Sequence, residues 1–153
     1  KDCYDLNDVL FTSDSSLVEI GDNSFANCLS LTNISMIPKK VKRIGKAAFQ
    51  YCEILGSITF DQSNECELEI IDDEAFDSCT NLEKVSVIPK HVKRIGDYAF
   101  GACQSLSSIT FQEGAEIEYI DNDAFNYTSI INIPVPANVK GLKEKFKMSH
   151  NSA

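Results

Sequence analysis

Cysteine and histidine are the residues of this 153-residue sequence whose types and spacing could support catalysis or metal binding. There are six cysteines and only two histidines, His91 and His150. A nucleophile with its base, or a set of zinc ligands, would need such groups close together. The sequence contains no Cys-x-x-Cys pair, no Cys/His zinc spacing and no H-E-x-x-H, G-x-S-x-G or P-loop motif. The spacing therefore predicts no catalytic residue and no cofactor.

A run of acids is the remaining candidate for a metal site. The stretch "IDDEAF" at residues 71–76 places three carboxylates together, which could attract calcium. Equally, acids are ordinary at the start of a helix, where they face the positive end of the helix dipole. His91 occupies the position that Lys40 takes in a sister segment, which favours a surface role over that of a base. We therefore expect no bound metal.

The elements around these residues repeat along the chain. The pattern I-x-x-x-x-F-x-x-C-x-x-L-x-x-[IV]-x-[apolar] begins at Ile20, Ile44, Ile71, Ile95 and Ile120, which lie 24, 27, 24 and 25 residues apart. The last copy fits if one residue is missing near the Cys position, and "CYDLNDVLF" matches the second half of a unit. A unit of this size buries too little apolar surface to fold alone, so we expect the units to stack as a solenoid.

Two kinds of unit alternate. The units led by Ile20 and Ile71 run into "IPKKVKRIG" (residues 37–45) and "IPKHVKRIG" (residues 88–96). Those led by Ile44 and Ile95 end in Phe and a longer acidic stretch, "DQSNECELEI" or "QEGAEIEY". The basic nonapeptide thus recurs because a pair of units recurs.

Each unit predicts the same local structure. In the first, "LTNISM" alternates as a strand that turns Ile34 and Met36 toward the core, and Pro38 ends it. "VKRI" is a second short strand, and "DNSFANC" is expected to form one or two helical turns capped by Asp22. Parallel stacking would form one main sheet, a second, narrower sheet and one column of phenylalanines. These are Phe25, Phe49, Phe76, Phe100 and Phe125.

Five of the cysteines occupy one repeat position, which predicts an inward row of small apolar thiols. They are Cys3, Cys28, Cys52, Cys79 and Cys103. Neighbouring Cβ atoms would lie about one strand spacing apart, wider than the ~3.8 Å of a disulfide, so we expect reduced thiols. Cys66 lies off this row in an acidic insertion, and its exposure and redox state stay open.

Charges of opposite sign alternate from unit to unit at the positions two and four residues before each lead isoleucine after the first. The two rows are Lys42, Glu69, Lys93 and Glu118, and Lys40, Glu67, His91 and Glu116. Because coils of a parallel stack lie ~4.8 Å apart, opposite charges would be neighbours along one edge. We interpret the basic nonapeptide as half of an ion-pair ladder, with a basic binding patch as the alternative. Arg43 and Arg94 do not fit the ladder, since Ile70 and Tyr119 fill the intervening positions.

The unit resembles the BspA-type leucine-rich repeat, whose pattern runs roughly L-x-x-I-x-I-P-x-x-V-x-x-I-G-x-x-A-F-x-x-C. "LTNISMIPKKVKRIGKAAFQYC" (residues 31–52) and "LEKVSVIPKHVKRIGDYAFGAC" (residues 82–103) match it with one extra residue before the Pro. The resemblance covers about residues 3–139. It implies an α/β solenoid: a right-handed leucine-rich-repeat superhelix of five to six coils with a parallel β-sheet and short helical turns.

Two departures from the family pattern carry their own expectations. The acidic units lack the Pro and are longer, so one edge should bulge there. The final unit lacks its Cys and has an irregular "IPVPANV", which indicates degeneration toward a cap. We expect the repeat domain to span residues 1–139 and residues 140–153 to be a basic tail that covers the last coil, with Leu142 and Phe146 on its apolar side.

Proteins of this family are typically cell-surface or secreted molecules of bacteria and parasitic protists, associated with adhesion to host proteins and cells. The resemblance therefore implies a non-enzymatic protein-binding or adhesion module, with a host or extracellular matrix protein as its partner. The alternatives are a structural spacer and an intracellular, cytoplasmic scaffold. The net charge of −9 argues against nucleic-acid binding, and no apolar run approaches the ~20 residues of a membrane span.

The outward positions of the first strand are the expected binding face, by architecture rather than by chemistry. They are Asn33, Ser35 and Ile37; Ser57, Thr59 and Asp61; Lys84, Ser86 and Ile88; and Ser108, Thr110 and Gln112. Ile37 and Ile88 could anchor a partner or tuck under the Pro turn. Two sequons, beginning at Asn33 and Asn126, are candidate N-glycosylation sites in a eukaryotic secretory setting.

Overall fold

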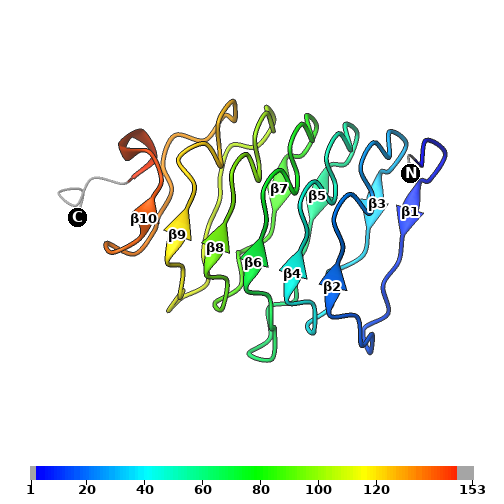
Figure 1. Ribbon diagram of the computed structural model, residues 1–153, viewed down its shortest axis with the longest axis horizontal. Coiled ribbons are helices and arrows are strands. Elements are labelled where there is room, and N and C mark those ends of the chain that lie inside the picture. Colours follow the sequence, from blue (N-terminus) through cyan, green and yellow to red (C-terminus); the bar gives the residue numbers. More distant parts are fainter. Residues whose placement is uncertain (1–2, 148–153) are drawn as a thin grey trace.

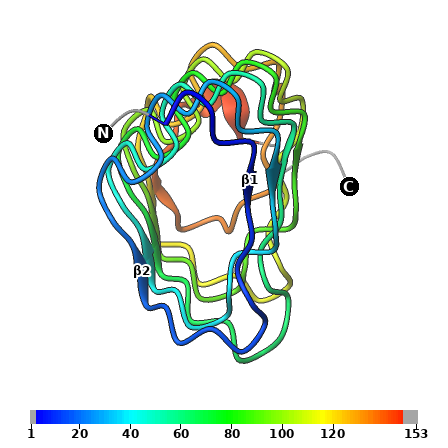
Figure 2. The same ribbon diagram turned by 90° about the vertical axis from the view of Figure 1, so that its right-hand side faces the viewer.

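Ten two-residue strands stack along one axis in the computed structural model, which describes residues 3–147. The strands are β1 (Asp8–Val9), β2 (Glu19–Ile20), β3 (Asn33–Ile34), β4 (Arg43–Ile44), β5 (Ser57–Ile58), β6 (Ile70–Ile71), β7 (Lys84–Val85), β8 (Arg94–Ile95), β9 (Tyr119–Ile120) and β10 (Lys140–Gly141). One short 3-10 helix, η1 (Glu144–Phe146), follows them. The result is a β-solenoid of about five turns, whose coils superpose when viewed along the axis (Figures 1 and 2).

The second strand of each unit builds the continuous sheet. Its order is β10-β9-β8-β6-β4-β2, and every neighbouring pair is parallel. The register aligns the lead isoleucines in one inward row: Ile20, Ile44, Ile71, Ile95 and Ile120, followed by Gly141. The predicted in-step stacking of the units is therefore confirmed.

The first strand of each unit builds an interrupted sheet. β1 pairs with β3 and β5 pairs with β7, but β3 and β5 are joined only through the bridge of Ile37 with Phe60. The same bridge recurs between Ile88 and Phe111. Each interruption follows a unit that ends in Ile-Pro, which we call a Pro unit and in which one extra residue precedes the proline. The alternation of unit types thus breaks this sheet and leaves the other continuous.

The turn segments form no helix, so the expected helical turns and the Asp22 helix cap are wrong. Asn23, Phe25 and Asn27 donate their N–H groups to carbonyls of the next coil, at 2.7–2.9 Å. Asn23 and Asn27 have φ near +60°, which interrupts a right-handed helix. The backbone of this segment is therefore satisfied by stacking, and Asp22 instead accepts the N–H of Lys46 from the next coil at 2.8 Å.

The core contains the expected column of phenylalanines. Phe25, Phe49, Phe76, Phe100 and Phe125 stack with ring centroids 5.2–5.4 Å apart and nearly parallel planes. Phe146 of η1 meets the last of these rings edge-on at 6.4 Å, and Leu142 is buried beside it. Residues 140–147 therefore extend the sheet and shield the final coil, while the rest of the expected tail lies outside the described residues.

The repeated cysteines line the core and form no disulfide among the described residues, as predicted. Cys52, Cys79 and Cys103 each donate a hydrogen bond to a phenylalanine carbonyl of the preceding coil, at 3.1–3.2 Å. Burial raises the pKa of Cys52 to about 12 and also raises the pKa of Cys79. These thiols stay protonated at neutral pH, so they act as packing groups and not as nucleophiles.

Candidate functional site

Two of the expected strand-face residues do not reach the surface. Ile37 is 2% exposed and Ile88 is fully buried, because their bridges to Phe60 and Phe111 place them in the core. The extra residue before each proline takes the outward place instead: Met36, expected in the core, is 42% exposed, and its counterpart Val87 is 37% exposed. Of the two alternatives for Ile37 and Ile88, a tucked position therefore holds over a partner anchor. The expected inward position of Met36 was wrong, since a bulged strand reverses its alternation at the bulge.

Four other strand-face residues serve the fold. The hydroxyl oxygens of Ser35 and Ser86 accept the backbone N–H groups of Phe11 and Phe60, at 2.6 and 2.8 Å, and so extend the joins between the coils of β1 and β3 and of β5 and β7 beyond the strands. Asp61 accepts the N–H of Ser63. Gln112 accepts the N–H of Lys90 at 2.9 Å. Substitution of any of these four would disturb the scaffold as well as the surface.

Six of the expected residues remain as an exposed face. They are Asn33, Ser57, Thr59, Lys84, Ser108 and Thr110. Five of the six are small and uncharged, so another protein backbone could approach this face closely. Leu10, Met36 and Val87 lie in the same outward row as Thr59 and Thr110 and add apolar contact area. Sequence reasoning missed Met36 and Val87, and the extra residue before each proline was the available signal.

The two sequons differ in their availability. Asn33 lies exposed in β3. The Asn126 amide is held on both sides: it donates to Asp123 and accepts from Lys143, each at 2.8 Å. A glycan on the Asn126 amide nitrogen would have to fit between Asp123 and Lys143, so the geometry favours Asn33 of the two.

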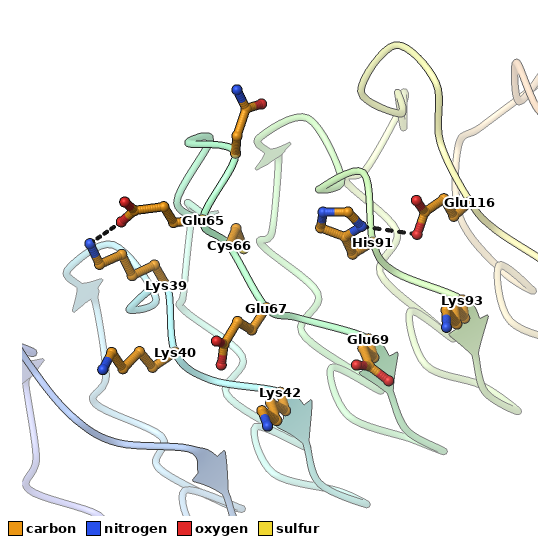
Figure 3. Close-up of a pocket in the computed structure, with 11 residues that line it drawn as sticks. Lys39, Lys40, Lys42, Glu65, Cys66, Glu67, Glu69, His91, Lys93 and Glu116 are labelled. Carbon is orange, nitrogen blue, oxygen red and sulfur yellow. Dashed lines mark hydrogen bonds and ion pairs between the residues drawn. The ribbon is translucent and has the colours of Figure 1, made fainter.

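The charged rows form one edge of the solenoid, which we call the seam: residues 38–42, 61–69, 89–93 and 112–118. The backbone N–H groups of Glu69, Lys93 and Glu118 each bond to the preceding residue of their row, Lys42, Glu69 and Lys93, at 2.8–2.9 Å. Figure 3 shows Lys42, Glu69 and Lys93 following one another on successive coils. The predicted alternation of charge along the seam is therefore confirmed.

Close ion pairs along the rows are scarce, so the predicted ladder was largely wrong. Among the described residues of the two rows, only His91 and Glu116 lie in contact, at 2.9 Å, and His91 lowers the pKa of Glu116. Lys39 adds a pair with Glu65 beside the rows (Figure 3). The other row charges except Glu118 face a groove of about 730 Å³. It is lined by Lys39, Lys40, Lys42, Asn64, Glu65, Cys66, Glu67, Glu69, His91, Lys93 and Glu116.

The acidic insertion shapes this groove. The loop before β6 projects from the seam, and Figure 1 shows it in green beyond the other turns of that edge. This is the bulge expected of the longer units. Cys66 lies in the insertion but is only 4% exposed, and burial raises the pKa of its thiol. The groove therefore presents ammonium and carboxylate groups and no activated nucleophile.

The arginines that did not fit the ladder each contact two or more carboxylates. Arg43 contacts Glu19 of the preceding coil, Asp22 at 2.7 Å and Asp72 of the next coil at 2.8 Å. Arg94 contacts Asp72 at 3.1 Å and Asp73 at 3.0 Å. Hydrogen bonding to Arg43 lowers the pKa of Asp22. Burial alone would raise the pKa of Asp72, but the Asp73 N–H and both arginines lower it.

These arginines also account for the acidic run that suggested calcium. Asp72 and Asp73 are neutralised by guanidinium groups, so this run is an ion-pair network. A second group of acids, Asp97, Asp121 and Asp123, converges with carboxylate oxygens within 4.8 Å of one another. Burial and then Asp121 raise the pKa of Asp97, whereas Lys143 lowers the pKa of Asp123. Exposed acids of this kind are common without a metal.

Nothing in the described residues assembles a catalytic centre. His91 is paired with Glu116, and His150 lies outside the described residues. No helix within residues 3–147 is long and apolar enough to cross a membrane. The molecule instead offers two surfaces, the strand face and the seam, whose chemistry suits binding.

Comparison with known families identifies the repeat. Residues 18–152 match the model described as the BspA type leucine rich repeat region, in six copies. No protein with curated function matches the sequence significantly.

Solved structures share the fold. A T. pallidum leucine-rich repeat protein superposes with a TM-score of 0.70 at 25% identity, over 84% of this chain and 58% of its own. The pneumococcal vaccine antigen PcpA gives 0.67 at 22% identity, over 88% and 42%. A leucine-rich cell surface protein from Faecalibacterium prausnitzii gives 0.60 at 24% identity, over 90% and 43%. The chain thus spans about half the length of these proteins.

Proposed function

This chain belongs to the BspA-type leucine-rich repeat family, and from that premise we propose that it is a non-enzymatic adhesion module that binds a protein through its strand face. The repeat is generally an interaction scaffold, and no enzymatic family is indicated. The right-handed sense of the solenoid, implied by the family, is part of this proposal.

The observation that carries the proposal is the presence of exposed strand positions with no task in the fold. Asn33, Ser57, Thr59, Lys84, Ser108 and Thr110 are exposed, whereas the other outward residues hold coils together or lie in the core. The exposed residues recur on successive coils at a spacing of ~4.8 Å. A flat, regularly spaced face with flanking Met36 and Val87 suits the close approach of another polypeptide.

We infer a cell-surface or extracellular location, with a host or extracellular matrix protein as the partner. One similar structure is described as a cell surface protein and another as a vaccine antigen. Such a location matches the family's association with adhesion.

The test uses two arginines placed on the face. Thr59→Arg with Thr110→Arg introduces bulk and charge where the strands are exposed and leaves Ser35 and Ser86 in place. Gln104→Arg with Asn122→Arg adds the same charge at exposed positions off both the strand face and the groove, and serves as the matched control.

Binding to immobilised host-matrix proteins, followed by surface plasmon resonance, is the measurement. The proposal expects saturable binding by the native chain, at least about tenfold weaker binding by the strand-face variant and native binding by the control. Equal binding by both variants would refute the choice of surface. No saturable binding by the native chain would favour a structural spacer.

A further inference from the structure

The groove on the seam is electrically balanced on a protein that is strongly acidic. Four lysines (Lys39, Lys40, Lys42 and Lys93) and four glutamates (Glu65, Glu67, Glu69 and Glu116) line it, whereas the chain carries a net charge of −9. The net charge therefore makes two copies repel each other in general, whereas the balanced groove adds no net repulsion.

Most of the charges in the rows are unsatisfied within the chain. Five of these charges make no ion pair within 4.0 Å among the described residues: Lys40, Lys42, Glu67, Glu69 and Lys93. The nearby Arg43 and Arg94, in contrast, each contact two or more carboxylates. These side chains point into the groove from successive coils (Figure 3). They are available to groups supplied from outside.

The order of the residues along the row decides which arrangement of charge fits it. From one end of the sheet to the other, the row reads Val18, Lys42, Glu69, Lys93, Glu118 and Lys140, as the backbone hydrogen bonds show. Read backwards, the same row places Glu118 opposite Lys42, Lys93 opposite Glu69, and the apolar Val18 opposite Lys140. The row is thus complementary to itself when reversed. A shift by one coil in either direction would bring like charges together wherever two charges of the row meet.

The second row and the shape of the edge follow the same rule. Reversed, the second row places Glu116 opposite Lys40 and His91 opposite Glu67. The acidic loop before β6 projects from the seam farther than the loops before β4 and β8 on either side of it (Figure 1). Reversal therefore places this projection opposite the less projecting loop before β8 of the other copy.

We propose that the seam is an interface with a second copy of this chain, related by a two-fold axis between the coils of Glu69 and Lys93. Lys42 of each copy faces Glu118 of the other, and Glu69 faces Lys93. Two-fold pairing is the commonest symmetry of homo-oligomers. This interface is separate from the strand face, which stays exposed on both copies, so neither proposal depends on the other.

Sedimentation velocity of the whole chain tests the proposal. At about 0.1 M salt, where charges interact over about 10 Å, we expect a concentration-dependent dimer. At about 1 M salt, where the Debye length is about 3 Å, the dimer should dissociate. A chain that stays monomeric at both salt concentrations would overturn the proposal.

Charge exchange distinguishes this interface from any other. Lys93→Glu alone and Glu69→Lys alone place like charges opposite each other, so each should raise the dimer dissociation constant at least about tenfold. An equimolar mixture of the two variants restores opposite charges across the axis and should again dimerise. Loss of stability within one copy cannot be rescued by mixing, so the mixture isolates the contact between copies.

Lys84→Glu is the matched control, because it makes the same charge change on the strand face. It should dimerise like the native chain. Failure of the mixture to dimerise, or equal loss of dimer in the control, would overturn the proposal. If a variant at position 69 or 93 fails to fold, Lys42→Glu and Glu118→Lys provide the same exchange one coil farther out. If the chain stayed monomeric and its groove instead bound a charged segment of a different protein, that result would also contradict the proposed dimer.

Discussion

Lys42 and Arg43 are neighbours in the sequence, yet their surroundings are opposite. Arg43 projects from the outer face of the continuous sheet and contacts Glu19 and Asp22 on the preceding coil and Asp72 on the next coil. Lys42 lies on the seam, faces the groove and makes no ion pair within 4.0 Å among the described residues. The outer face of the continuous sheet, which we call the sheet face, thus uses its charges to hold coils together. The seam leaves its charges available to groups from outside the chain.

The difference comes from side-chain geometry and from what each coil offers. The guanidinium group is a planar fork with five donors, so one arginine can bond carboxylates on both sides of its coil. Aspartates follow the lead isoleucines directly and place carboxylates beside it, as Asp72 does between Arg43 and Arg94. Lysine is a flexible point charge, and exposed lysine–glutamate pairs gain little from contact. Alternating charge alone therefore does not establish ion pairing.

The largest loss of stability on the sheet face is expected from a substitution that forces two of its coils apart. A Cβ on Gly45 would lie 2.7 Å from the backbone nitrogen of Asp22 and 2.8 Å from the carbonyl carbon of Gly21. Because backbone atoms cannot move aside, Gly45→Ala should lower the free energy of unfolding by about 1–3 kcal/mol or more. Gly56→Ala is the control, since no atom lies within 4 Å of its Cβ. It should be neutral or stabilising by less than about 1 kcal/mol.

Urea denaturation of the two glycine variants makes this comparison. Equal stability of the Gly45 and Gly56 variants would mean that the coils of the sheet face are not packed as closely as the structure shows.

Acid should weaken the sheet face through its aspartates. The folded-state pKa values of Asp22 and Asp72 lie below their ordinary value of 3.8. Their contribution to stability is therefore complete above that value and is lost as the pH falls through the lowered folded-state values. Asp97 acts in the opposite sense, because its pKa is raised. We expect the acid-unfolding midpoint of Arg43→Gln, followed by circular dichroism, to lie at higher pH than that of the native chain. An unchanged midpoint would contradict the assigned role of Arg43.

Repeat spacing in the sequence was sufficient to predict the core. Phe49 and Cys52 recur at fixed distances from each lead isoleucine, and residues at equal repeat positions must stack if the units are in register. The Phe column and the absence of disulfides in the cysteine row were predictable for that reason, whereas the burial of Leu142 and Phe146 was predicted from the apolar side of the tail.

Local conformation was not predictable from the same pattern. The stretch "ISMIP" can place either Met36 or Ile37 toward the core, depending on where the bulge lies. The sequence alone therefore led to the wrong choice of the inward residue. The segment after Gly21 has the composition of a helix start, but positive φ at Asn23 and Asn27 directs its N–H groups to the next coil. These outcomes depend on the neighbouring coil, which a single unit does not encode.

The candidate surfaces were predictable in part. The strand face was correctly placed by architecture for residues such as Ser57 and Thr59, and its use for binding stays a prediction. The seam rows were predicted by counting from the isoleucines. The network of Arg43 and Arg94 was missed because its partners lie at other repeat positions, Asp22, Asp72 and Asp73.

One pair of variants tests the division between the two charged regions most directly. Arg43→Gln and Lys42→Gln remove the same charge from adjacent residues, and each is measured by its free energy of unfolding in urea. We predict a loss of about 1–2 kcal/mol for Arg43→Gln, allowing for its partial exposure, and a change within about 0.5 kcal/mol for Lys42→Gln. Equal losses in the two variants would contradict the account, because the seam would then be holding the coils together as much as the sheet face does.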